Sequence, residues 1–166
     1  MRTDNNGQIS AEFLLIIGIM IIVVMISISF VASQNELTMA MTAARNGVDE
    51  GFASSASAVY PIDSYNDYSR SGYLLLNPYS VEIVNISYEY LGYDTNYNKE
   101  KIRFIVYAHA LKDFNRKELD SIGDRINYDL RKSIALTFDT SKSTNKLYNP
   151  VFSPRYVFTT ANVKWV

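Results

Sequence analysis

The stretch of sequence that decides the fold is GQISAEFLLIIGIMIIVVMISISFVA, residues 7–32. From Phe13 onward it carries no charge, and only one glycine and two serines interrupt the apolar run. A helix of about 20 residues is about 30 Å long, which matches the hydrocarbon core of a bilayer. Serine hydroxyls in such a helix can donate to carbonyls of the preceding turn. The sequence therefore predicts a transmembrane helix over residues 13–32.

This apolar segment differs from the core of a secretory signal peptide. Such peptides have a basic start, a shorter apolar core and a cleavage site of small residues. Here Arg2 is offset by Asp4, the apolar run is longer, and the one weak cleavage candidate is Ser27-Ile28-Ser29. We expect a retained span. Cleavage near residues 28–33, which would release a secreted head, is the alternative.

A polar motif stands directly before the span, with Gln8, Ser10 and Glu12 following Gly7. A carboxylate at the edge of an apolar helix is costly unless it has a partner. One interpretation places Glu12 at the level of the lipid headgroups, in the first helical turn, where the helix dipole favours an anion.

The second interpretation comes from a resemblance. The pattern Gln8-x-Ser10-x-Glu12 after a glycine resembles the class III signal peptide of archaeal type IV-like pilins. In that family a prepilin peptidase cuts after the glycine. The resemblance implies a leader of residues 1–7, cleavage between Gly7 and Gln8, and a mature chain in which Glu12 is the fifth residue.

Two positions depart from the family pattern. Ile16 stands where the family has leucine, and Asn6 where it usually has a basic residue. The resemblance ends with the apolar segment. Because small major pilins have little beyond their helix, the length of this chain is more typical of a minor pilin.

The resemblance also implies an assembly mechanism and a set of partners. Cleavage would create an α-amine at Gln8, and the Glu12 carboxylate would neutralise this amine on a neighbouring subunit, setting register and orientation. The implied partners are the prepilin peptidase, other pilin subunits, the assembly machinery and, before assembly, membrane lipid. The alternative is a membrane-tethered extracellular binding protein that uses a pilin-type signal without forming filaments.

We infer the orientation of the span in the membrane from the short N-terminal segment rather than from the distribution of charge. Arg2 is the only basic residue before the span and Arg45 the first after it, so the positive-inside rule hardly distinguishes the two orientations. We expect the N-terminus to stay inside, with the rest of the chain exported to the cell surface or pilus.

The helical pattern continues past the span to residue 58. Apolar residues recur at steps of three or four, which predicts an amphipathic stripe: Leu37, Met41, Ala44, Val48 and Phe52. Gly47 and Gly51 each lower helix propensity by about 1 kcal/mol relative to alanine, so we expect bending there. Pro61 closes the helix, which gives a pilin-like helix over residues 8–58.

The remaining residues, 59–166, are predicted to form an α+β head domain. Residues 62–79 have a loop composition with an Asn77-Pro78 turn. Residues 81–91 and 101–111 are rich in β-branched and aromatic residues and show the apolar–polar alternation of strands. A turn at 92–98 joins them, which indicates an antiparallel hairpin. In the second strand one face would hold Ile102, Phe104, Val106, Ala108 and Ala110.

A second helix and a last strand complete the predicted head, a small antiparallel sheet with one packed helix. The helix carries an apolar stripe and begins at a capping box of Asn115 and Glu118. The stripe consists of Leu119, Ile122, Ile126, Leu130 and Ile134. Residues 156–166 are predicted to be the strand.

Composition excludes several function classes. The chain has no cysteine, a single histidine and a net charge of -1, which leaves no thiolate site, no pair of imidazoles and no basic field for nucleic acid. It contains no phosphate loop, nucleophile elbow or metalloprotease helix. We therefore expect no enzyme, no cofactor and no metal; an anchored enzyme is the weakest alternative.

Four further features have a structural and a functional interpretation. His109 lies mid-strand without an obvious partner, which favours a structural role over a ligand or base. Asp120, Asp124 and Asp129 alternate with arginines, which favours a solvated helix face over calcium binding. Nine of the 13 tyrosines fall between residues 60 and 97, where they either cover a thin sheet or form a contact surface. Asn85-Ile86-Ser87 is the one N-glycosylation acceptor sequence, which is either used in an exported surface protein or a chance occurrence inside a predicted strand.

Overall fold

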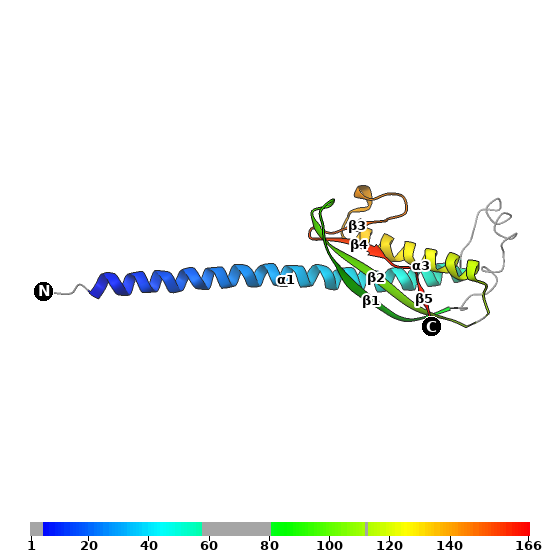
Figure 1. Cartoon of the computed structure of the whole chain (residues 1–166), viewed down its shortest axis with the longest axis horizontal. Helices are drawn as coiled ribbons and strands as arrows, with labels where there is room; N and C mark the ends of the chain where they lie inside the picture. The colour runs from blue at the N-terminus through cyan, green and yellow to red at the C-terminus, as the bar shows by residue number, and fades with distance from the viewer. Residues whose placement is uncertain (1–4, 58–80, 112) are drawn as a thin grey trace. The chain divides into compact units, whose positions relative to one another are not determined.

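The computed structural model describes residues 5–57, 81–111 and 113–166. The predicted loop 62–79, Pro61 and the tyrosines from Tyr60 to Tyr79 lie outside these residues. The elements are shown in Figure 1 and follow in this order: α1 (Asn5–Ser57), β1 (Val81–Asp94), β2 (Lys99–Ala110), α3 (Arg116–Thr137), the short 3₁₀ helix η1 (Ser141–Ser143), β3 (Val151–Phe152), β4 (Tyr156–Thr160) and β5 (Lys164–Trp165). The α+β class is confirmed. The chain divides into two compact units, Met1–Thr38 and Met39–Val166.

Helix α1 is one helix of 53 residues and begins three residues before Gln8. The serines in its apolar part do not interrupt it. The Ser27 hydroxyl donates to the Val23 carbonyl at 2.8 Å, one turn back along the helix, as the sequence predicts. The polar group is thereby satisfied within the helix itself.

The sheet is mixed, not antiparallel as expected. β1 and β2 form the predicted antiparallel hairpin, and β3 pairs with β4 in the same sense. β4 and β5, however, both run parallel to β2. The strand order is β1-β2-β4-β3, and β5 pairs separately with β2. The chain between β2 and β4 contains α3, and this helical crossover allows a parallel pair.

The tail is also more divided than its sequence pattern suggests. The expected strand 156–166 is interrupted at residues 161–163 and continues as β5. β3 is only two residues long, and no strand was expected there.

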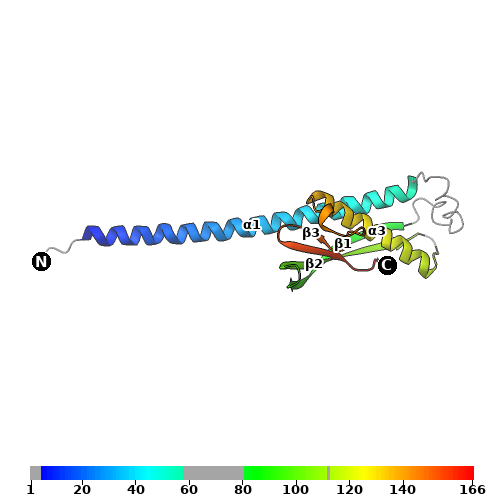
Figure 2. The same ribbon diagram turned by 90° about the horizontal axis from the view of Figure 1, so that it is seen from above.

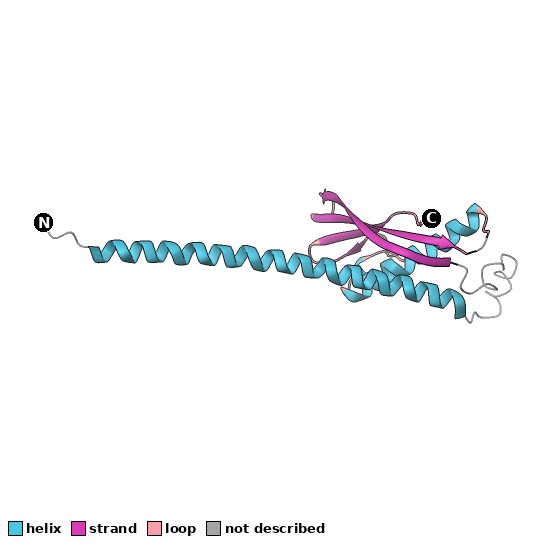
Figure 3. Ribbon diagram, turned by 90° about the horizontal axis from the view of Figure 1, so that it is seen from below, coloured by secondary structure: helices cyan, strands magenta, loops and turns pink. Residues whose placement is uncertain are grey.

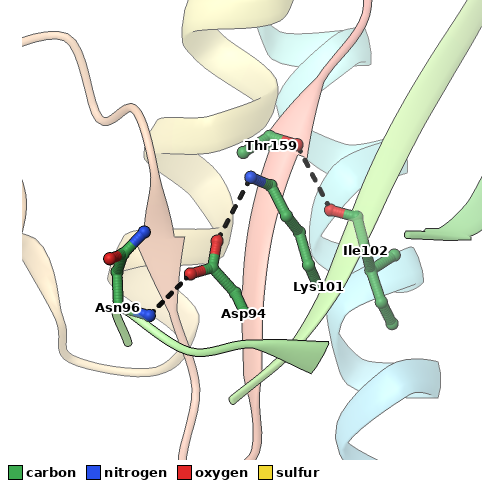
Figure 4. Close-up of polar contacts among 5 residues, drawn as sticks. All are labelled: Asp94, Asn96, Lys101, Ile102 and Thr159. Atoms are coloured by element: carbon green, nitrogen blue, oxygen red, sulfur yellow. Dashed lines mark hydrogen bonds and ion pairs between the residues drawn. The ribbon is translucent and has the colours of Figure 1, made fainter. Parts of the chain in front are cut away.

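The hairpin turn lies at residues 95–98, within the predicted turn 92–98. Asp94 holds both sides of it: one carboxylate oxygen accepts from the Asn96 backbone amide at 3.0 Å, and the other lies 3.2 Å from the Lys101 ammonium (Figure 4). Asn98 closes the turn with φ 54°, a left-handed conformation that asparagine tolerates well. Figure 4 also shows the Thr159 hydroxyl of β4 donating to the Ile102 carbonyl of β2 at 3.5 Å.

Helix α3 begins at the predicted capping box. The Asn115 side chain accepts from the Glu118 amide at 3.0 Å, and the Glu118 carboxylate accepts from the Asn115 amide at 2.8 Å. The first-turn donors are thus satisfied reciprocally. Three residues of the predicted apolar stripe, Ile126, Leu130 and Ile134, are buried, while Leu119 and Ile122 are half-buried.

The core of the unit Met39–Val166 lies between the sheet and two helices. Figure 3 shows the strands as one layer, with α3 and the second part of α1, from Met39 onward, against one face. The predicted inner face of β2 is confirmed for Ile102, Phe104, Val106 and Ala108, which are all fully buried. Ala110, at the end of the strand, is only half-buried. The Phe158 ring of β4 packs 5.8 Å from the Phe104 ring and fills the centre of this layer.

The second part of α1 contacts α3 through small residues. Ala40, Ala43, Ala44, Gly47, Val48 and Gly51 are all buried. A methyl group added at Gly47 would lie 2.6 Å from the Asp129 carbonyl oxygen and 2.9 Å from the Leu130 Cα, so that α1 and α3 approach at backbone distance there (Figure 2). The interpretation of Gly47 and Gly51 as bending points was wrong. They are points of close helix contact, where only glycine leaves room.

Candidate functional site

The candidate functional site is the part of α1 from Ser10 to Val31. Its large apolar side chains lie on every side of the helix, and each exposes between 37% and 65% of its surface. A helix that is apolar all round is suited to a membrane or to the interior of an assembly. The segment is long and apolar enough to cross a membrane, with a mean hydropathy of 3.1 in its best window.

A single acidic group marks the start of this apolar segment. Ser10 and Glu12 are both exposed on α1. The sequence places no other charged residue between Glu12 and Glu36, and no basic residue between Arg2 and Arg45. The carboxylate therefore has no cationic partner in its own helix before Arg45.

The peptide bond between Gly7 and Gln8 lies in the first turn of α1, within the helical backbone that starts at Asn5. The first amides of a helix have no intrahelical acceptor, and glycine has low helix propensity. Both effects weaken the helix at this point. The bond is therefore easier to open than one in the middle of the span.

Comparison with known proteins defines this segment. Residues 5–31 match the family model described as "Class III signal peptide". This is the signal of type IV pilin-like precursors. The chain carries it, together with the apolar helix of a membrane-anchored precursor. The matched range contains all of the motif residues: Gly7, Gln8, Ser10, Glu12 and Ile16. No curated protein and no solved structure gives a significant match to the chain.

The single histidine has a partner that the sequence did not suggest. His109 lies on the outer face of β2, opposite the buried side chains, as predicted. Its ring Nδ1 is 2.5 Å from the Val166 oxygen, and the Val166 amide donates to the Ala108 carbonyl at 2.9 Å. His109 therefore helps to hold the end of the chain on the sheet, which is a structural role.

The three aspartates of α3 do not share one environment. Asp120 and Asp124 are exposed and line a cavity of about 260 Å³, together with Leu119, Gly123, Asn162, Val163 and Trp165. Asp129 is half-buried beside Gly51 of α1, and this burial raises its pKa above the ordinary value. The prediction of a solvated face is wrong for Asp129. No group of three or more potential metal ligands occurs in the described parts of the chain.

Four of the five described tyrosines of the β1–β2 hairpin are largely exposed, and Tyr107 is half-buried. Tyr88, Tyr90, Tyr93 and Tyr97 each show between 39% and 59% of their surface. Three of them still pack: the Tyr88 ring lies 6.3 Å from the buried Phe104 ring and 6.1 Å from the Tyr90 ring, and the Tyr97 ring lies 5.2 Å from the Phe152 ring. These side chains cover the sheet and leave part of their aromatic surface exposed, while the Tyr93 hydroxyl donates to Asn98 Oδ1 and the Tyr90 hydroxyl forms a hydrogen bond with Tyr156.

Sequence reasoning missed the contact surface on the second part of α1. A signal was present, because small residues recur there at steps of three or four: Ala40, Ala43, Ala44, Gly47 and Gly51. Such spacing puts small side chains on one helix face, which permits close helix approach. The apolar stripe concealed the pattern because Ala44 and Val48 belong to both.

Proposed function

We propose that the chain is the precursor of a structural subunit, of the minor type, of an archaeal type IV-like pilus, with a role in surface attachment. A prepilin peptidase cuts it after Gly7. The observation that carries the proposal is the class III signal at residues 5–31, joined to a helix whose apolar side chains are exposed all round.

The exposed apolar helix gives the subunit two successive environments. Before assembly its side chains contact membrane lipid, because exposing this apolar surface to water is unfavourable. In the filament the same side chains pack against the helices of other subunits, which replaces lipid contacts with protein contacts. The assembly machinery in the membrane transfers the subunit from one to the other.

Glu12 pairs neighbouring subunits in this proposal. Its carboxylate has no cationic side chain in its own helix before Arg45, whereas cleavage creates an α-amine at Gln8. Pairing with the amine of the next subunit satisfies two charges that apolar surroundings would otherwise leave unpaired. A buried pair of this kind fixes axial register and orientation more than it adds stability.

The mature chain then has two parts, a helix of residues 8–58 and a head of residues 59–166. The head lies outside the cell, at the surface or on the pilus. Its exposed tyrosines, Tyr88, Tyr90, Tyr93 and Tyr97, support a role in attachment, because a phenol combines a large apolar face with a polar tip.

Gly7→Val tests the processing step. A β-branched side chain at the scissile bond should block cleavage, so that the first tryptic peptide begins at Thr3 and ends at Arg45 instead of beginning at Gln8. The control is Gly18→Val, a glycine in the same helix with no atom within 4 Å of an added Cβ, which should still be cut. Normal cleavage of Gly7→Val would refute the proposal.

The same exposed tyrosines also favour the second candidate, a membrane-tethered extracellular binding protein that does not polymerise. Shearing cells separates the two. A pilus subunit is recovered with the sheared filaments, whereas a tethered protein stays with the membranes. Glu12→Gln should move a pilus subunit from filaments to membranes without altering cleavage, and should leave a tethered protein where it was.

A further inference from the structure

The sequence Asn85-Ile86-Ser87 lies in an unusual place on the sheet. It is the one Asn-x-Ser/Thr acceptor in the chain. We propose that Asn85 is a site of N-glycosylation on the exported head. The inference rests on the proposed function, because the head must leave the cell to meet a glycan donor.

A β-bulge sets the position of Asn85. The register of β1 against β2 shifts between Ile83, which faces Ala108, and Asn85, which faces Tyr107. Val84 is left without a partner across the ladder and exposes 58% of its surface. Bulges of this kind bend an edge strand and re-aim its side chains. Asn85 itself is exposed.

The two functional residues of the acceptor sequence share one face of β1. Side chains alternate along a strand, so that Asn85 and Ser87 point to the same side and Ile86 to the other. Ile86 is buried and faces Val106 of the core. Two residues beyond Ser87, Glu89 pairs with Arg103 on the same face as Asn85. The amide and the hydroxyl therefore lie on the outer face of the sheet, away from the helices.

The side-chain carboxamide of Asn85 has no hydrogen-bond partner among the described residues. Other asparagines are engaged: Asn127 is buried and donates to the Ala161 carbonyl at 2.8 Å, and Asn115 caps α3. A transferase can take the Asn85 side chain without breaking any contact that holds the head together.

The reaction requires an oligosaccharide linked through phosphate to a membrane lipid, and a membrane transferase. The Nδ2 atom of Asn85 attacks the anomeric carbon of the first sugar and forms the N–C bond. The bond from that carbon to the phosphate oxygen breaks, the lipid phosphate leaves, and Nδ2 gives up one proton to a base of the transferase. The product is a bulky, solubilising group on the surface of the head.

A glycan at this position protects an open edge. Among the described residues, β1 pairs with β2 alone, and its other edge faces no strand. A 14-residue edge strand is a template for pairing with another chain, and proteins block such edges with bulges or bulk. The sugar at Asn85 adds bulk at the bulge, so that this part of β1 does not serve as a contact between subunits.

The test is tryptic mass mapping of full-length protein from native cells. Cleavage after Arg70 and Lys99 releases peptide 71–99, which contains Asn85. In the wild type this peptide should carry the added mass of a glycan at Asn85. Ser87→Ala, which leaves the asparagine in place, and Asn85→Gln should both lose it, whereas Ser87→Thr should keep it. Asn96→Gln, in the same peptide and outside the acceptor sequence, is the control and should also keep it.

Two outcomes would overturn the inference: an unmodified peptide 71–99 in the wild type, or a modification that survives in Ser87→Ala. The peptide that ends at Arg45 reports separately on processing. If it starts at Gln8 while peptide 71–99 is unmodified, the proposed function stands and the glycan site fails. If it starts at Thr3 while peptide 71–99 is modified, the glycan site stands and the processing proposal fails.

Discussion

The two parts of helix α1 share one helical backbone but differ in side-chain size and burial. From Phe13 to Val31 all side chains except those of one glycine and two serines are large and apolar, and all of the large ones remain exposed. From Ala40 to Gly51 a face of small side chains is buried against α3 and the sheet. Large side chains keep their apolar surface available for lipid or other subunits, whereas small ones let the helix enter the core of its own head. Apolar character alone therefore does not say which partner a helical segment has.

The largest expected difference in head stability is between glycine-to-valine substitutions at one position in each part of α1. Gly47→Val should destabilise the head by about 3 kcal/mol, because the new side chain meets the backbone of Asp129 and Leu130 and forces the helices apart. Denaturant unfolding of the full chain in detergent, followed by fluorescence of its only tryptophan, Trp165, measures this. Gly18→Val, where an added Cβ meets nothing within 4 Å, should leave head stability unchanged. Equal effects at the two glycines would remove the distinction.

Shortening one valine in each part of α1 tests the same difference by removing side-chain atoms instead of adding them. Val48 is fully buried, and Val48→Ala should cost the head about 2 kcal/mol through lost apolar burial and a residual cavity. Val24 exposes 54% of its surface, and Val24→Ala should not change the same unfolding curve. A cost at Val24 as large as that at Val48 would mean that the apolar part of α1 supports the head directly.

The smallest expected effect concerns the charge at the α1–α3 contact. Burial raises the pKa of Asp129 above its ordinary 3.8, and the nearby Glu50 adds to this against the opposing charge of Lys132. Because the folded state holds this proton more tightly, the free energy of unfolding falls as pH rises from 3.8 through the folded pKa. Asp129→Asn should therefore stabilise the head at neutral pH by less than about 1 kcal/mol, the effect being small for a half-exposed group.

The measurement is the thermal midpoint as a function of pH. The difference between Asp129→Asn and wild type should vanish on acidification below the ordinary aspartate pKa. Asp120→Asn, which removes an exposed carboxylate from the same helix, is the matched control. A destabilising Asp129→Asn at neutral pH would show that the carboxylate makes a favourable contact with α1.

The sequence predicted the elements whose signals are local. The capping box at Asn115 and Glu118, the hairpin and the long helix all follow from residues within a few positions of one another, and all are confirmed. The signal motif was recognisable for the same reason, because its residues keep a fixed spacing next to an apolar run. Cleavage, pairing through Glu12 and the glycan site remain predictions.

What sequence reasoning missed depends on residues far apart in the chain. The parallel pairing of β4 with β2 joins segments more than 50 residues apart, and no local pattern sets its direction. Gly47 was misinterpreted because helix propensity describes an isolated helix, whereas the gap it leaves is filled by α3. His109 gained its partner from the far end of the sequence in the same way.

The position of β2 has a consequence for the order of events at the membrane. This strand lies between β1, its neighbour in sequence, and β4, which follows only after α3 and a long connection. The head therefore cannot close its sheet until residues 156–160 have been synthesised, long after the apolar helix at residues 13–31. Pairings between distant segments also form slowly. If the chain is exported as proposed, anchoring precedes folding, and each head completes its core while already tethered by the apolar helix.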